Sequence, residues 1–247
     1  MRSLCVCGVA VLGALSMPVL AQSSGSSGWR NSAQKFDLPL PGVPHRVVGA
    51  PYSGQLVAES VRVDPDGTKH VAPPRYQRVF RDSQGRTRVE YTLPMMAVPG
   101  GQARDSATVI IVDDLVEGYA YLLDTQRNVA HRMKLPKPGT SGRPVPSGAA
   151  LSAADTREKL GMMVVQGEAA DGRRLTVGGG GIDEWTIPDL KVTALRVIRL
   201  PALGNESTQR LTNLSRSEPD PALFEVPQGY TVVDEATTFL VDFAPLP

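Results

Sequence analysis

Hydrophobic and polar residues alternate along short runs through most of this chain, and turn-forming residues separate the runs. A period of two is typical of β-strands, because successive side chains of a strand point to opposite faces of the sheet. The pattern predicts about ten strands. The main runs lie at 55–63, 76–81, 86–91, 108–112, 119–123, 128–134, 159–166, 173–177, 191–200 and 208–215.

Turn signals fall between these runs. Residues 64–67, Asp-Pro-Asp-Gly, are expected to turn the chain into a short return strand at 68–71. Residues 82–85 are expected to join the next hairpin, with Gly85 where the backbone needs a positive φ. Two short helices are predicted: one at 149–157, and one helical turn in which Asp220 caps and Pro221 occupies the first position.

This order of elements predicts a mainly all-β fold. Strands and turns follow one another every 8–12 residues, which favours a curved antiparallel meander sheet or an open or half barrel with one or two short helices. Residues 184–190 are predicted to form a short strand that ends at Pro188, so Trp185 is expected to be a core residue. Phe224, on the helical turn, is expected to be another.

The apolar faces of the strands suggest what covers the sheet. The runs at 108–112 and 191–200 are apolar on much of both faces, while little helix is available to cover them. Three coverings remain open: the sheet curls over its own inner face, the Pro-rich segments 29–48 and 135–148 lie across it, or an apolar ligand fills the concavity.

The first residues are typical of an export signal. Arg2 precedes an apolar run that ends in small residues before Gln22, so residues 1–21 are predicted to be a signal peptide. A retained anchor is the alternative, but the run is short for a membrane span. After it we predict an irregular N-terminal arm at 22–50 and an antiparallel β domain at 51–247, with a Pro/Gly-rich loop at 135–150.

Cleavage at this site would change the chemistry of the chain. Cys5 and Cys7 are its two cysteines, and both precede the cleavage site. The exported protein would therefore have no disulfide, no cysteine nucleophile, no thiolate metal site and no stable membrane anchor. Without Arg2 the count is 25 basic against 25 acidic residues, so no net field would recruit nucleic acid. A periplasmic or secreted location follows.

Three loop motifs resemble known sites but lack essential parts. Residues 64–67 resemble the start of a calcium loop, whose closing glutamate is replaced by Arg75. The glycines at 178–181 have no following Lys-Ser/Thr or helix to bind phosphate, so a flexible loop is expected. Ser32 and Lys35 have the spacing of a serine-lysine acyl enzyme without its companion motifs.

The remaining titratable residues do not form a recognisable catalytic set. His45, His70 and His131 lack the spacing of a helical zinc motif, although convergence in space stays open. Asp113-Asp114 and Asp183-Glu184 are paired carboxylates, but neighbours on a strand point to opposite faces. We expect solvated charges there, and predict no catalytic, metal or cofactor-binding residue.

Four arginines gather on the second predicted hairpin: Arg78, Arg81, Arg86 and Arg88. An anion could bridge such a cluster. The nearby acids Asp82 and Glu90 instead favour a self-paired, solvated face.

Several segments together resemble a family of uncharacterised exported bacterial proteins of acidobacterial type. The matching residues are 51–53, 81–88, 158–161, 184–185, 210–213 and 218–227, and the likeness spans about 51–234. The family implies no assigned activity. More loosely, the chain resembles the half-barrels of periplasmic lipoprotein carriers and envelope-stress sensors, although it lacks their long N-terminal amphipathic helix, which puts a closed hydrophobic cavity in doubt.

The sequence thus predicts an exported, non-catalytic β-protein of the bacterial envelope that binds a hydrophobic small molecule. The first alternative is a partner-docking or structural protein that contacts another envelope protein, through an exposed sheet edge or apolar patch. The second is a hydrolase of unknown substrate, which would require Asp113, Asp183, Glu184 and a histidine to converge in one pocket.

Overall fold

The computed structural model describes residues 35–38, 46–93, 107–135, 156–236 and 239–242. These residues form a mainly β structure with fourteen strands, two 3₁₀ turns and, within the described ranges, no α-helix. Twelve strands make one open, mostly antiparallel sheet, and β1 (Lys35–Leu38) pairs with β14 (Phe239–Asp242) in a separate two-stranded sheet. The predicted fold class is confirmed.

The large sheet consists of two meanders in which strands that are consecutive in sequence are neighbours in space. The first meander is β2 (Tyr52–Val63), β3 (Lys69–Arg81), β4 (Thr87–Leu93), β5 (Ala107–Asp114), β6 (Tyr119–Asp124) and β7 (Val129–Lys134). The second is β8 (Thr156–Val165), β9 (Glu168–Val177), β10 (Gly180–Ile187), β11 (Val192–Leu200) and β12 (Asn205–Ser215). Antiparallel pairing of β2 with β12 joins the two, and β13 (Thr231–Glu235) adds in parallel to β7.

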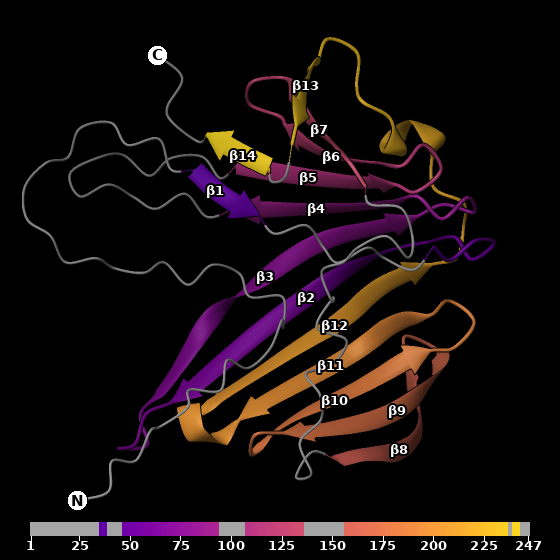
Figure 1. Ribbon diagram of the computed structural model, residues 1–247. Helices are drawn as coiled ribbons and strands as arrows, with labels where there is room; N and C mark the ends of the chain where they lie inside the picture. The colour runs from indigo at the N-terminus through magenta and orange to yellow at the C-terminus, as the bar shows by residue number, and fades with distance from the viewer. Residues whose placement is uncertain (1–34, 39–45, 94–106, 136–155, 237–238, 243–247) are drawn as a thin grey trace, which may run out of the picture.

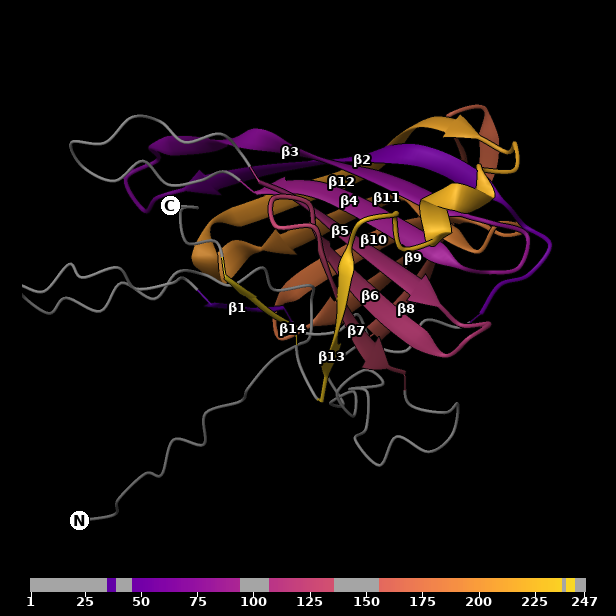
Figure 2. The same ribbon diagram turned by 90° about the horizontal axis from the view of Figure 1, so that it is seen from above.

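The sheet bends strongly. Seen from above, β5–β7 and β8–β10 lie on the same side of the central strands β2 and β3 (Figure 2), and Figure 1 looks into this concave side. A hydrogen bond across the concave side identifies the inner face: the Arg81 guanidinium on β3 reaches the Leu190 carbonyl in the β10–β11 turn, although β2 and β12 separate β3 from β11 in the sheet.

The outer face of the first meander is covered by the segment that connects β12 to β13. Its turn η2 (Pro221–Phe224) begins at Asp220, whose carboxylate accepts a hydrogen bond from the Ala222 N–H, as predicted. Phe224 is 2% exposed and packs against Phe80, Ile110, Val112, Leu123 and Ala130. The Arg86 guanidinium stacks 5.1 Å from the Phe224 ring centroid, and Arg88 donates to the Leu223 carbonyl.

A second apolar cluster joins the two meanders. Its buried members come from β3, β8, β9, β12 and the region around the β10–β11 turn: Val79, Val165, Ala170, Ile187, Leu190, Ala194 and Leu211. Trp185 packs against this cluster and is partly buried rather than fully buried. Gly172 makes room for the ring, because a Cβ at that position would lie 2.6 Å from the indole nitrogen.

Four local expectations were wrong. The predicted strands at 68–71 and 76–81 are one strand, β3, with Pro73 and Pro74 at a register irregularity where a missing N–H is tolerated. Gly178 and Gly179 make a tight hairpin turn, while Gly180 and Gly181 already belong to β10. The strand predicted at 173–177 begins earlier, since β9 begins at Glu168, and Arg157, at the end of the predicted helix, lies in β8.

Some predicted segments fall on residues outside the described ranges. These are the signal peptide at 1–21, residues 136–150 of the predicted loop, residues 149–155 of the predicted helix, and most of the N-terminal arm, in which residues 35–38 form β1. In the described part of the chain, no helix is long and apolar enough to cross a membrane.

Replacing Phe224 with Ala tests the covering of the outer face. The Phe224→Ala variant should lose about 3–5 kcal/mol of unfolding free energy, because the substitution leaves a cavity among buried apolar side chains. Leu203→Ala is the control, since Leu203 is 67% exposed and should change stability by less than about 0.5 kcal/mol. Chemical denaturation measures both; equal stabilities would contradict this packing.

Candidate functional site

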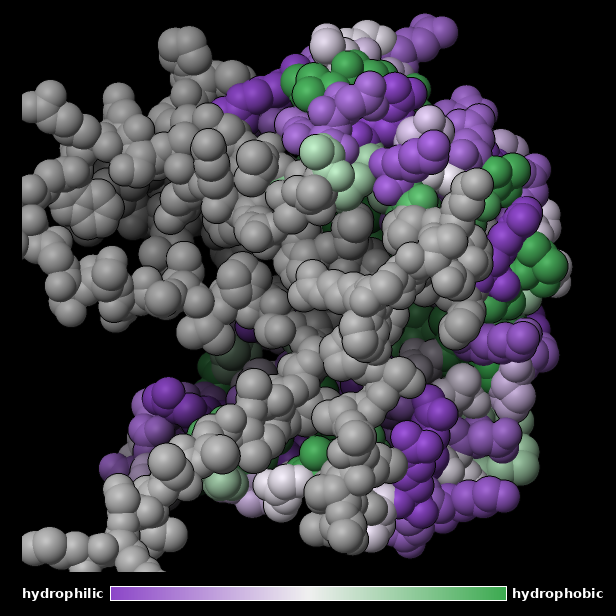
Figure 3. Space-filling model, in the orientation of Figure 1, coloured by the Kyte–Doolittle hydropathy of each residue, from purple (hydrophilic) through white to green (hydrophobic). Residues whose placement is uncertain are grey.

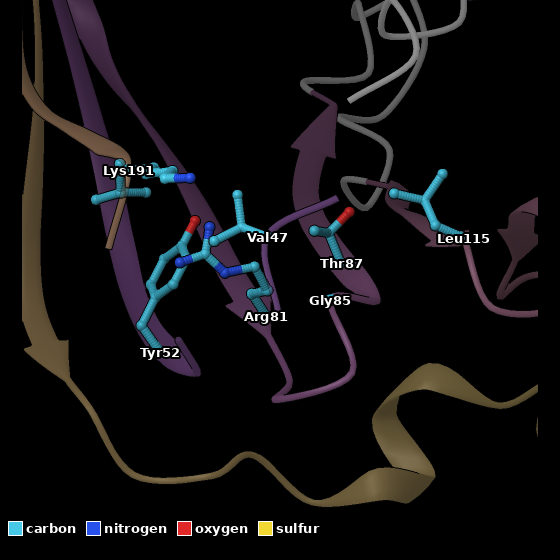
Figure 4. Close-up of a pocket in the computed structure, with 8 residues that line it drawn as sticks. Val47, Tyr52, Arg81, Gly85, Thr87, Leu115 and Lys191 are labelled. Atoms are coloured by element: carbon cyan, nitrogen blue, oxygen red, sulfur yellow. The ribbon is translucent and has the colours of Figure 1, made fainter. Parts of the chain in front are cut away.

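A row of directly opposed residues crosses the inner face of the first meander. Tyr52 on β2 lies opposite Arg81 on β3, Arg81 opposite Thr87 on β4, and Thr87 opposite Asp113 on β5. We call these four residues the polar row. Cross-strand partners share a face, so all four side chains belong to the inner face. Figure 4 shows three of them, Tyr52, Arg81 and Thr87. The polar row places a cation and an acid two strands apart.

Arg81 is a buried cation without an acidic partner. Its side chain is 5% exposed, and Nε and Nη2 donate to the carbonyls of Ala50 and Leu190 at 2.5–2.9 Å. The guanidinium lies 4.8 Å from the Tyr52 ring centroid. Within the described residues, no carboxylate lies at salt-bridge distance and nothing accepts a hydrogen bond from Nη1. Burial lowers the pKa of Arg81, which is the signature of an uncompensated charge.

A cavity of about 400 Å³ opens beside Arg81. Its lining combines apolar side chains with a few polar groups: Val47, Tyr52, Arg81, Gly85, Thr87, Leu115, Lys191 and Val192. We call it the inner pocket. Residues from both meanders contribute to it, so it depends on the bend of the sheet. This composition, mostly apolar with convergent polar groups, is typical of small-molecule sites.

Lys191 and Tyr52 bring two further polar groups to the inner pocket. In Figure 4 the Lys191 amine and the Tyr52 hydroxyl both point toward the space beside the Arg81 guanidinium. Lys191 has a positive φ of 51°, a conformation that is unusual for a side chain with a Cβ. Burial raises the pKa of Tyr52, and the Arg81 charge opposes that rise. The phenol is therefore neutral and can donate a hydrogen bond.

Asp113 ends the polar row and is poorly compensated. It is 6% exposed; Oδ2 accepts a 3.5 Å hydrogen bond from the Thr87 hydroxyl, and Oδ1 has no partner within the part of the chain that is described. Burial raises the pKa of Asp113 to about 6, and the Thr87 hydrogen bond only partly offsets this. Asp114 points to the other face, as predicted, and caps the β5–β6 turn through the N–H groups of Val116 and Glu117.

The other predicted carboxylate pair is compensated by arginines. Asp183, 2% exposed, binds Arg174 in a bidentate manner at 2.6 and 2.8 Å and also accepts from Arg199. These hydrogen bonds lower the pKa of Asp183. Glu184, on the opposite face, pairs with Arg173 and Arg196. The expectation of solvated charges was wrong for Asp183, Asp113 and Asp114, which are 2%, 6% and 5% exposed.

This pairing extends over the surface of the second meander. Hydrophilic residues gather over β8–β10 in the space-filling view (Figure 3). The carboxylates of the proposed hydrolase do not converge, because five strands separate β5, with Asp113, from β10, with Asp183 and Glu184.

The arginine cluster of the second hairpin divides between the two faces. Arg78 and Arg88 pair with Glu90, and Arg86 pairs with Asp82, which confirms the predicted self-pairing for three members. The prediction of a solvated face was wrong, because Arg88 and Asp82 are only 8% and 2% exposed. Arg81 does not take part in this pairing. It lies three positions after Arg78 on β3, an odd number, so its side chain is on the opposite, inner face.

The histidines have separate partners. His70 contacts Asp64 at 2.7 Å beside the 64–67 turn, where Gly67 N–H donates to the Asp64 carbonyl. His131 contacts Glu235 on β13 at 2.7 Å. Among the described residues, no group of three or more acidic, histidine or cysteine residues could bind a metal ion. His45 and Ser32 lie outside the described ranges.

Comparison with known proteins finds distant structural resemblances. No protein-family profile and no curated protein matches the sequence. An uncharacterised conserved protein from Thermus thermophilus superposes with a TM-score of 0.44 at 12% identity, covering 75% of this chain and 91% of that one. MucB, in its complex with MucA from Pseudomonas aeruginosa, gives 0.44 at 14%, covering 75% and 58%.

A DUF1329 family protein from Desulfovibrio piger gives a TM-score of 0.23 at 13% identity, covering 71% of this chain and 90% of that one. This chain spans little more than half of the MucB chain but most of the other two. The exported family predicted from the sequence remains a prediction.

Asp113→Asn tests the burial of the unpaired carboxyl. Because the folded-state pKa is raised, the stability that the neutral carboxyl contributes is complete below its unfolded pKa of about 3.9 and is lost as the pH rises through about 6. Wild type should lose about 2 kcal/mol more unfolding free energy between about pH 4 and pH 7 than Asp113→Asn.

The neighbouring variant Asp114→Asn is the control for this measurement, because its side-chain oxygen can still accept from Val116 and Glu117. It should retain the wild-type slope. Denaturant titrations across the pH range measure all three proteins, and identical slopes in wild type and Asp113→Asn would refute the assignment.

Proposed function

We propose that this chain is an exported, non-catalytic β-protein of the bacterial envelope that binds a hydrophobic small molecule in the inner pocket. The observation that supports it is the cavity of about 400 Å³ on the concave face, with Val47, Leu115 and Val192 in its lining. A cavity of this size is in the range of small-molecule sites. The predicted signal peptide supports export.

The alternatives are less well supported by the geometry. A hydrolase would need a nucleophile or a general base beside its electrostatic partners, and the acids that we proposed for that role lie on distant strands. Asp183 is also engaged by two arginines, which lower its pKa and its strength as a base.

Native mass spectrometry and organic extraction of protein purified from its own host test the proposal. We expect a copurified apolar compound, or a rise in melting temperature with one or more medium-chain aliphatic compounds. Val47→Trp should abolish either effect, because the indole fills the inner pocket. Val48→Trp is the matched control, since Val48 is 59% exposed and does not line it. If the purified protein contains no ligand and no such compound stabilises it, the proposed binding function is refuted.

Partner docking is the second candidate, and edge strand β8 favours it. Met162 and Val164 are 70% and 71% exposed there, and no described strand pairs with the free side of β8. An extended apolar segment of another envelope protein could add to this edge as a further strand.

Met162→Lys/Val164→Lys should abolish capture of such a partner while the inner pocket still binds its ligand. Crosslinking in the periplasm measures capture, and Leu203→Lys, at another exposed apolar position, is the control. Unchanged capture would exclude the β8 edge.

A further inference from the structure

We infer that the ligand of the inner pocket is an amphiphile with an anionic head group, which binds between Arg81, Lys191 and the Tyr52 hydroxyl. This inference rests on the proposed function, since it names the chemical class of the molecule in that pocket. It is carried by a buried guanidinium that has no acidic partner and retains free donors at the wall of an otherwise largely apolar cavity.

The donors of Arg81 are only partly used. A guanidinium has five N–H groups in a fixed plane. Nε and Nη2 donate to Ala50 and Leu190, which fixes the plane, while the Nη1 donors have no acceptor in the described part of the chain. A carboxylate or phosphate oxygen accepts such bonds at roughly twice the strength of a neutral acceptor. Arg81 therefore offers hydrogen-bond donors that are already oriented to bind an anion.

The two charged residues in the lining, Arg81 and Lys191, are both cations. Lys191 contributes a second cation to the lining, and the Tyr52 hydroxyl has no hydrogen-bond partner among the described residues. The acids nearest in sequence are already engaged: Asp82 binds Arg86, and Asp189 binds Arg216. No described carboxylate competes with a ligand for the Arg81 end of the pocket, whereas Val47, Leu115 and Val192 suit an aliphatic chain.

The arrangement also opposes other head groups. A cationic amphiphile would place like charges beside a buried guanidinium, which is unfavourable where the local dielectric constant is low. A neutral alcohol could accept a hydrogen bond from Arg81 but would leave its charge uncompensated. The head group is thus a carboxylate or a phosphate ester, which share negative charge and several acceptor oxygens.

Isothermal titration with decanoate, decyl phosphate, decanol and decyltrimethylammonium, each below its micellar concentration, tests the inference on the full mature protein. We expect one or both anions to bind about tenfold tighter than decanol, and the cation to bind more weakly than decanol. The two anionic probes distinguish a carboxylate from a phosphate.

Two variants locate the charge. Tyr52→Phe keeps the ring beside Arg81 and removes the hydroxyl, and Lys191→Gly removes the amine at a backbone position with a positive φ that glycine adopts freely. Each should weaken binding of the preferred anion about three- to tenfold and leave decanol unchanged. Asn128→Gly, at another exposed residue with a positive φ, controls for the backbone effect. Arg81 itself is not replaced, because it also bonds two carbonyls.

The outcomes separate the inference from the proposed function. Equal affinities for decanol and both anions would overturn the anionic head group while the pocket remains a hydrophobic site. An anion preference that both variants leave unchanged would overturn the placement of the head group beside Tyr52 and Lys191. Failure of every probe to bind would overturn the proposed function and the inference together.

Discussion

Pairing of β2 with β12 is the constraint on which the rest of this structure depends. It joins two meanders that would otherwise be separate sheets, each with an unpaired edge that invites aggregation. The register sets Leu56 opposite Leu211, so apolar side chains from both meanders meet on the inner face. Because the joined sheet bends, the β10–β11 turn reaches β3, and the inner pocket forms between parts of the chain more than a hundred residues apart.

Arg81 meets two demands at once. Its bonds to Ala50 and Leu190 tie the first meander to the second, which compensates part of the cost of burying a guanidinium. Carbonyl dipoles and the Tyr52 ring do not neutralise the charge, which is why its pKa is lowered. Arg81 thus keeps an unpaired charge and free N–H donors, which are the properties of an anion-binding residue. The neighbouring arginines lack them, because they form ion pairs with Asp82 and Glu90.

Local chemistry predicted most elements but could not predict how they meet. The period of two located most strands, and the Asp220-Pro221 signal located η2 with its cap. The parallel pairing of β13 with β7 was missed, because nothing in a five-residue run specifies a partner a hundred residues away. The alternation of side chains along β3 would have placed Arg81 and Arg78 on opposite faces. That Arg81 has no acidic partner follows only from the order of the strands in the sheet.

The contrast between Asp183 and Asp113 shows that strand register determines whether a buried carboxylate has a cationic partner. Arg174 and Arg199 lie beside Asp183 on the same face, whereas the cross-strand neighbours of Asp113 are Thr87 and Ala120. Arg81 lies two strands from Asp113, about 10 Å between backbones, so neither neutralises the other. Burial instead favours the protonated form of Asp113 and raises its pKa. Because that pKa is about 6, Asp113 carries its charge at neutral pH, so Arg81 sets the sign of the potential beside the inner pocket through its place in the lining and not through loss of the Asp113 charge.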